Sequence, residues 1–145
     1  MTTALFPGSF NPFTRGHLSI ARRAAGIFDR LIIAVGVNIS KSSPAQIDEL
    51  ICKIKEAVKD IHNVEVISYS GLTVDVCRQF GAGVIVRGLR NSYDFNYEQQ
   101  LAEVNRKISG IETIFLNSTP ELACISSSMV RELSGFGVDV TEFLP

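Results

Sequence analysis

Four short segments of the chain carry side chains that can bind anions. The first is PGSFNPFTRGH, Pro7–His17, which holds a serine, a threonine and an imidazole. The others are Lys41, the segment RGLR (Arg87–Arg90) and the segment ISSS (Ile125–Ser128). Cations, hydroxyls and the N–H groups at helix starts are the donors that bind phosphate groups in proteins. These residue types therefore predict a polyphosphate site, provided that the fold brings the four segments together.

The elements that must position these segments alternate along the chain. Short apolar, β-branched runs predict strands, and apolar residues spaced by three or four predict the helices that follow them. Asp94 is expected to cap the fourth helix, and Gly81 to end the third. No tight hairpin signal separates the strands, so the pattern predicts a mostly parallel sheet in one α/β domain over residues 1–145. The expected strands are Thr3–Phe6, Arg30–Asn38, Val64–Ser68, Gly83–Leu89 and Glu112–Asn117, and the expected helices are His17–Phe28, Gln46–Asp60, Leu72–Phe80, Asp94–Ile108 and Ser126–Gly137.

In an open parallel sheet, ligands bind beyond the carboxyl ends of the strands, where loops lead into helices. All four segments follow expected strands, so we expect them at one edge of the sheet. The sequence has no G-x-x-x-x-G-K-[ST] motif, and no G-x-G-x-x-G follows the first strand, so a different loop must hold the anion.

Each candidate also has a purely structural interpretation. Gly8 and Gly16 suit turns, His17 and the serines Ser126–Ser128 suit helix caps, and Lys41 suits a solvated loop. Their joint occurrence at strand ends favours the anion site over these separate interpretations.

Composition narrows the classes of function. A chain of 145 residues with 46% hydrophobic residues suits one globular domain, and a net charge of −1 gives no support to nucleic-acid binding. No apolar run approaches the roughly 20 residues that span a bilayer, and no signal peptide is expected, so we predict a cytoplasmic protein with no membrane partner. Cys52, Cys77 and Cys124 are odd in number and far apart, which argues against a disulfide framework and a cysteine-based zinc site. His62 is expected on the surface.

Several of these motifs resemble those of known proteins. Thr14-Arg15-Gly16-His17 resembles the [T/H]-x-G-H signature of the nucleotidyltransferase superfamily, and ISSSMVR (Ile125–Arg131) resembles its second, I-S-S/T-x-x-x-R signature. The stretch VRGLRNSYDFNYEQQLAEVNR (Val86–Arg106) and the closing DVTEFLP resemble the phosphopantetheine adenylyltransferase family of coenzyme A biosynthesis. The resemblance covers nearly the whole chain, and it implies a Rossmann-like five-stranded parallel sheet with helices on both faces.

The resemblance implies a reaction and a set of residues. The adenylyl group of ATP, bound with Mg²⁺, would pass to 4′-phosphopantetheine by direct in-line attack, giving dephospho-coenzyme A and pyrophosphate without a covalent enzyme intermediate. The implied catalytic residues are His17, as transition-state stabiliser, and Lys41, and no residue is implied as a direct metal ligand. The implied ATP-binding residues are Ser9, Phe10, His17, Gly88, Leu89, Arg90, Glu98, Leu122, Ala123, Cys124, Ile125, Ser126, Ser127 and Ser128. The implied phosphopantetheine-binding residues are Ser9, Lys41, Thr73 and Arg87.

The resemblance further implies a homo-hexamer, with dephospho-coenzyme A and coenzyme A as product or inhibitor. The chain departs from the family at Asn11, where relatives often carry Asp, and at Leu122, where they often carry an aromatic residue. The stretch after Lys41, which begins with Ser42 and Ser43, lacks the usual family pattern. The C-terminal helix of the family is expected to be short or absent.

Two alternatives stay open at this point. One is another nucleotidyltransferase, of the nicotinate-mononucleotide adenylyltransferase or glycerol-phosphate cytidylyltransferase type, against which the block Arg87–Arg106 argues. The other is a non-catalytic nucleotide-binding protein on the same fold, against which the presence of Ser9, His17, Lys41, Arg87 and Arg90 argues.

Overall fold

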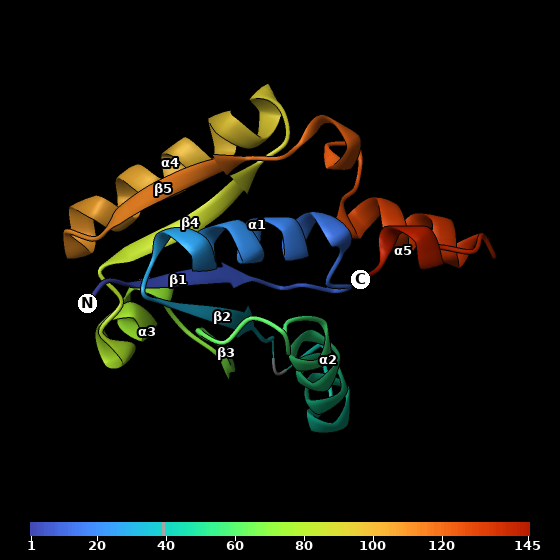
Figure 1. Ribbon diagram of the computed structural model, residues 1–145, viewed down its shortest axis with the longest axis horizontal. Coiled ribbons are helices and arrows are strands. Elements are labelled where there is room, and N and C mark those ends of the chain that lie inside the picture. The colour runs from blue at the N-terminus through green and yellow to red at the C-terminus, as the bar shows by residue number, and fades with distance from the viewer. Residues whose placement is uncertain (39) are drawn as a thin grey trace.

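The computed structural model describes residues 1–38 and 40–145. Its centre is one sheet in which five parallel strands take the order β3-β2-β1-β4-β5 (Figure 1). The strands are β1 (Thr3–Gly8), β2 (Arg30–Gly36), β3 (Val64–Tyr69), β4 (Val84–Leu89) and β5 (Glu112–Asn117). The expected five-stranded parallel sheet is therefore confirmed.

Helices cover both faces of this sheet. They are α1 (Arg15–Ile27), α2 (Pro44–Ala57), α3 (Thr73–Phe80), α4 (Ser92–Ser109) and α5 (Ser127–Gly135). Ile20 of α1 and Ile54 of α2 pack on one face of the sheet, in a core shared with Ile33 of β2. Val74 of α3 packs on the opposite face, in a second core that includes Leu5 of β1. Because both faces are covered, the central strands are apolar along their whole length, as in the run Leu31–Val35.

Helix α4 lies on the same face of the sheet as α3. Side chains alternate between the two faces along a strand, so Arg87 of β4 shares a face with Ile85, which belongs to the α3 core. The Arg87 side chain binds Glu98 of α4, which places α4 on that face beside β4 and β5.

Most element boundaries differ by one to three residues from those expected, and for three of them the structure shows the cause. β1 extends past Phe6, because Pro7 and Gly8 stay in register with β2. α1 begins at Arg15 rather than His17, because Thr14 caps it. α4 begins at Ser92, and its cap is Asn91 rather than Asp94, since the Asn91 side chain accepts the backbone N–H of Asp94 at 3.0 Å. The expected cap by Asp94 is therefore wrong. Asp94 instead lies in the first turn of the helix, where its carboxylate is free to bind elsewhere.

The order of the strands determines where a ligand can bind. The chain moves from β1 outward to β2 and β3, then returns to the other side of β1 to form β4 and β5. Connections that leave β1 and β4 therefore run to opposite sides, which opens a crevice beyond the carboxyl ends of these two neighbouring strands. The loop Ser9–Thr14 and the start of α4 both border it.

Candidate active site

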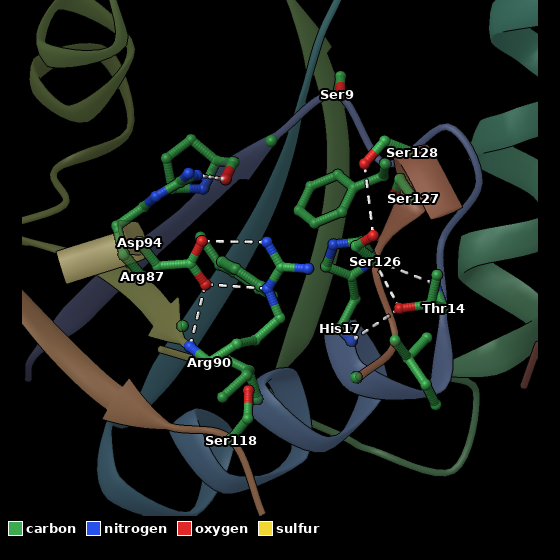
Figure 2. A pocket seen from close by; sticks show the side chains of 18 of the residues that line it. Ser9, Thr14, His17, Arg87, Arg90, Asp94, Ser118, Ser126, Ser127 and Ser128 are labelled. Atoms are coloured by element: carbon green, nitrogen blue, oxygen red, sulfur yellow. Dashed lines mark hydrogen bonds and ion pairs between the residues drawn. The ribbon is translucent and has the colours of Figure 1, made fainter. Parts of the chain in front are cut away.

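A cavity of about 340 Å³ lies in this crevice (Figure 2). Its walls come from the end of β1 and the loop after it, the start of α1, the β4–α4 connection and the start of α5. Three of the four segments singled out in the sequence thus meet at this cavity, and Lys41, the fourth, does not line it. The predicted site residues that line the cavity are Ser9, Phe10, His17, Arg87, Gly88, Arg90, Glu98, Ile125, Ser126, Ser127 and Ser128.

Other predicted site residues lie outside the lining of this cavity. They are Lys41, Thr73, Leu89, Leu122, Ala123 and Cys124. Lys41 is exposed, and its backbone N–H donates to the carbonyl of Asn38 at 2.9 Å. The Thr73 hydroxyl is 2.9 Å from the hydroxyl of Tyr69, on the α3 side of the sheet. These residues lie at or after the ends of the strands. Their roles in binding or catalysis are proposals.

The cavity also holds residues that the sequence did not single out as ligand-binding. Asp94, Ser118 and Arg131 are of this kind, and they line the cavity together with Thr14 of the first segment. Asp94 stands four residues after Arg90, and Arg131 ends the ISSSMVR segment. The position of each in the sequence therefore indicated that it could lie close to the site. Ser118 had none, because it reaches the cavity only through the path of the chain after β5.

The first wall of the cavity is a loop that is fastened at several points. Phe10 is buried with a φ of 49°, and its ring lies so close to Gly8 that a Cβ there would be 2.9 Å from Cζ. A larger residue at position 8 would displace this ring. The Ser127 hydroxyl donates to the Pro12 carbonyl at 2.7 Å, and Arg131 donates to the Asn11 carbonyl. The start of α5 is thereby tied to the loop.

Asn11 itself is exposed and lies outside the lining of the cavity. The departure from the family at this position therefore changes no group that faces the described cavity. What Asn11 contributes to the site is its backbone carbonyl, which anchors Arg131.

His17 is held in one orientation by the start of its own helix. The backbone N–H of Thr14 donates to Nδ1 of His17 at 3.0 Å, while the Thr14 hydroxyl accepts the backbone N–H of His17 at 3.3 Å. Phe13 stacks on the imidazole at a centroid distance of 5.5 Å, and Phe10 meets it edge-on at 5.0 Å. Because Nδ1 accepts a hydrogen bond, we assign the proton of the neutral ring to Nε2.

The surroundings of His17 keep its ring uncharged. Burial, and then the positive charges of Arg87 and Arg90, lower the pKa of His17 from 6.5 to about 4. At neutral pH the ring is therefore uncharged, and it can donate a hydrogen bond through Nε2.

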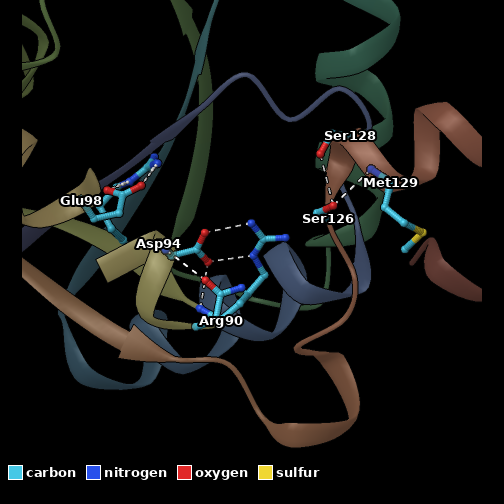
Figure 3. A network of polar contacts seen from close by, with 8 residues as sticks. Arg90, Asp94, Glu98, Ser126, Ser128 and Met129 are labelled. Carbon is cyan, nitrogen blue, oxygen red and sulfur yellow. Dashed lines mark hydrogen bonds and ion pairs between the residues drawn. The ribbon is translucent and has the colours of Figure 1, made fainter. Parts of the chain in front are cut away.

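Two arginines on the opposite wall are each paired with a carboxylate of α4. Arg87 donates from Nε and Nη2 to the two carboxylate oxygens of Glu98, at 2.8 and 2.6 Å. Arg90 donates from Nε and Nη2 to Asp94 at 2.9 and 3.0 Å, and its backbone N–H donates to Asp94 as well. Asp94 and Glu98 are one turn apart on the helix (Figure 3). Burial alone lowers the pKa of Arg87, but the hydrogen bonds and charge of Glu98 outweigh it and raise this pKa.

Neither a metal-binding cluster nor a membrane-spanning helix is found in the part of the chain that the structure describes. Within residues 1–38 and 40–145, no cluster of three or more His, Cys, Asp or Glu side chains is arranged to hold a metal ion. In the same residues, no helix has the length and apolar character needed to cross a membrane.

Comparison with known proteins adds to this geometry. The model of the cytidylyltransferase-like family matches residues 5–133. The whole chain is 44% identical to the phosphopantetheine adenylyltransferase of Bacteroides fragilis, of which it covers 97%. It is 49% identical over 142 residues to the same enzyme of Porphyromonas gingivalis, with 98% of this chain and 93% of that relative covered. The chain belongs to the phosphopantetheine adenylyltransferase family.

A solved structure agrees on the fold of this adenylyltransferase family member. A bifunctional NMN adenylyltransferase/ADP ribose pyrophosphatase from Francisella tularensis aligns with 99% of this chain at a TM-score of 0.70 and 16% identity. The chain spans 44% of that larger protein. At this identity the likeness supports the Rossmann-like fold alone.

Proposed function

We propose that this chain transfers the adenylyl group of ATP to the phosphate of 4′-phosphopantetheine, with dephospho-coenzyme A and pyrophosphate as products. The observation that carries the choice of substrates is the 44–49% identity, over essentially the whole chain, to enzymes of that name. A second observation supports a reaction between phosphate groups. The cavity combines a fixed neutral donor with three guanidiniums, which are groups that bind phosphate oxygens.

The proposed reaction is a direct displacement at the α-phosphorus of ATP. An oxygen of the acceptor phosphate forms the new bond, the bond from the α-phosphorus to the bridging oxygen of the β-phosphate breaks, and pyrophosphate leaves with that oxygen. The attacking phosphate is already an anion, so the step needs no general base. Holding the two phosphates in line lowers the activation free energy, by an amount on the order of 7–11 kcal/mol in favourable cases.

His17 is the proposed donor to the oxygen that gains charge on the α-phosphate. Its Nε2–H is the donor that the capping arrangement at Thr14 leaves for the cavity. Because the ring is already neutral and already oriented, it needs neither proton transfer nor reorganisation as the charge develops. A fixed donor of this kind is worth roughly 2.7–4 kcal/mol.

The charges at the cavity support the proposal that ATP binds together with Mg²⁺. Arg87, Arg90 and Arg131 stand against Asp94 and Glu98, so three positive and two negative side chains leave a net charge of +1. That is too little for two phosphate substrates. Asp94 and Glu98 are both paired with arginines. The cavity therefore suits a Mg²⁺ ion that is bound by ATP oxygens and water rather than by protein carboxylates. The metal would neutralise phosphate charge.

The remaining assignments follow the family resemblance. Ser9 and the amide of Phe10 are proposed to hold phosphate, and Lys41 to approach the reacting groups from its exposed loop. Gly88, Leu89 and Arg90 are proposed to contact the nucleotide, and Thr73 the pantetheine arm. The segment Leu122–Ser128 is proposed to surround the adenine and the phosphate tail, and coenzyme A, which ends in the same pantetheine group, to bind as an inhibitor.

An apolar stripe on α4 supports the proposed homo-hexamer. Tyr97, Leu101, Val104 and Ile108 follow one another by three or four residues and are 40–62% exposed. Such a row of exposed apolar side chains is typical of a helix that packs against a partner. We propose that copies of this chain associate through this stripe, in the cytoplasm.

The decisive experiment measures pyrophosphate release by the purified protein with Mg²⁺-ATP and one acceptor at a time. 4′-Phosphopantetheine should give turnover well above that with nicotinate mononucleotide or glycerol 3-phosphate. Turnover with either of these and none with phosphopantetheine would establish the alternative nucleotidyltransferase, and binding of ATP without any turnover would establish the non-catalytic one.

The role of His17 is tested by two variants in the same assay. His17→Asn retains an acceptor for the Thr14 N–H but has no group at the position of Nε2, so kcat should fall by about 10²–10³ with little change in the KM for ATP. His17→Gln places an amide near the Nε2 position and should recover part of the loss. A His17→Asn enzyme with wild-type kcat would remove His17 from the mechanism.

A further inference from the structure

Glu98 is unusual among the residues of α4. Among the described residues of α4, Glu98 alone is buried, with an exposed fraction of 7%, and its side chain carries a carboxylate. A buried carboxylate is costly unless it is paired and hydrogen-bonded. Here the pairing is with Arg87, and it engages both oxygens of Glu98.

Arg87 is held from a second direction as well. Its Nη1 donates to the carbonyl of Pro7 at 2.5 Å, so its guanidinium joins α4 to the end of β1. A guanidinium has five N–H donors. Within the described residues three of them are engaged, which leaves two for a ligand in the cavity. Three bonds to two separate elements fix both the position and the plane of the group.

We propose that Glu98 is a positioning residue for the acceptor: it orients Arg87 so that the remaining N–H donors bind the phosphate of 4′-phosphopantetheine. This role rests on the proposed function. It differs from the ATP contact that the family resemblance implies for Glu98, because the effect on substrate passes through Arg87. Asp94 holds Arg90 with the same two-bond geometry one turn earlier, so α4 orients both cations of this wall (Figure 3).

A purely structural ion pair would behave differently from a positioning one. Loss of a structural pair lowers stability and leaves the affinity of the folded enzyme for each substrate unchanged. Loss of a positioning pair changes the affinity for the one substrate whose phosphate Arg87 binds. Misplacing a binding group by about 1 Å can cost on the order of 10²-fold.

The test measures binding of each substrate alone by calorimetry, on wild type, Glu98→Gln and Glu98→Asp. Glu98→Gln removes the charge at nearly the same shape, and Glu98→Asp keeps the charge on a stem too short for the same fork. Both should weaken binding of 4′-phosphopantetheine by 10-fold or more and change the affinity for a non-hydrolysable ATP analogue by less than 3-fold. Pantetheine, which lacks the phosphate, should bind wild type and variants alike.

Two further variants keep the result interpretable. Glu103→Gln is the matched control, because Glu103 pairs with Arg106 on the exposed side of the same helix, and it should bind all three ligands like wild type. If the Glu98 variants do not fold, as judged by circular dichroism, Arg87→Lys takes their place. It retains a cation that cannot form the fork, and it should show the same selective loss.

The outcomes separate the two proposals. Wild-type affinity for phosphopantetheine in the folded variants, or a larger loss for the ATP analogue, overturns the positioning role and leaves the proposed function intact. A wild-type protein that does not bind phosphopantetheine overturns both.

Discussion

The low pKa of His17 makes a prediction about stability that is independent of any substrate. In the unfolded chain a histidine has a pKa of about 6.5, whereas burial and the two arginines hold His17 at about 4 in the folded protein. Between these values the unfolded chain takes up a proton that the folded protein does not. Stability is therefore unaffected at neutral pH and falls as the pH drops through 6.5 toward 4.

The size of the effect follows from the two pKa values. At pH 5 the unfolded histidine is almost fully protonated and folded His17 is about one-tenth protonated, which costs about 2 kcal/mol relative to pH 7. His17→Asn lacks this titration but retains an acceptor for Thr14. The free energy of unfolding of the variant minus that of wild type should therefore rise by about 2 kcal/mol between pH 7 and pH 5.

Urea unfolding of both proteins at pH 7, 6 and 5, at one protein concentration, measures this difference. Other titrating groups are shared by the two proteins and cancel, unless they contact His17. His62→Asn is the matched control for a histidine-to-asparagine substitution, because it removes the other histidine, which is exposed and lies outside the site. A His17→Asn difference that does not change with pH would refute the reasoning, because it would mean that His17 titrates alike in both states.

Three other predictions concern separate parts of the molecule. Gly8→Ala should lower the free energy of unfolding by about 1–3 kcal/mol, because the new Cβ meets the Phe10 ring. Gly26→Ala is the control: a Cβ there has open space beside α1, so the free energy of unfolding should stay unchanged or rise slightly. Equal urea midpoints for the two variants would contradict this. Cys77 is buried in the α3 core, and burial raises the pKa of its thiol to about 11, so a thiol reagent at pH 8 should label it only after unfolding. Rapid labelling of all three thiols in the native protein would be incompatible with that placement. Leu101→Glu in the exposed α4 stripe should reduce the molar mass measured by light scattering, and an unchanged mass would exclude that stripe as the contact.

Much of the fold could be predicted because its signals are local. β-branched runs, apolar spacing and the glycine after α3 depend on near neighbours in sequence, and β5 was predicted with its observed bounds. Of the boundary errors explained above, the one at β1 comes from its pairing with β2, and those at α1 and α4 come from capping side chains. Asn91 rather than Asp94 caps α4, because the competition between two capable residues is settled by backbone geometry.

The site was predictable to the extent that it depends on strand order. Parallel strands carry their following loops to one edge, so Ser9, His17, Arg87 and Ser126 meet there as expected. Ser118 gave no signal, because its approach depends on the path of the chain after β5. Lys41 and Thr73 had chemistry of the right kind but follow β2 and β3, on the side of β1 away from β4, and they do not line the cavity.

The sequence by itself determined the alternation of strands and helices, the polyphosphate chemistry and, through its motifs, the family. Those properties depend on residue types and on short spacings in the sequence. Only the tertiary structure decided the state of the groups. Whether His17 is neutral depends on burial and on two arginines more than 60 positions away in the chain. Whether Arg87 points into the cavity depends on a carbonyl of β1 and a carboxylate of α4. Charge state and orientation are set by neighbours in space, and the fold alone brings those neighbours together.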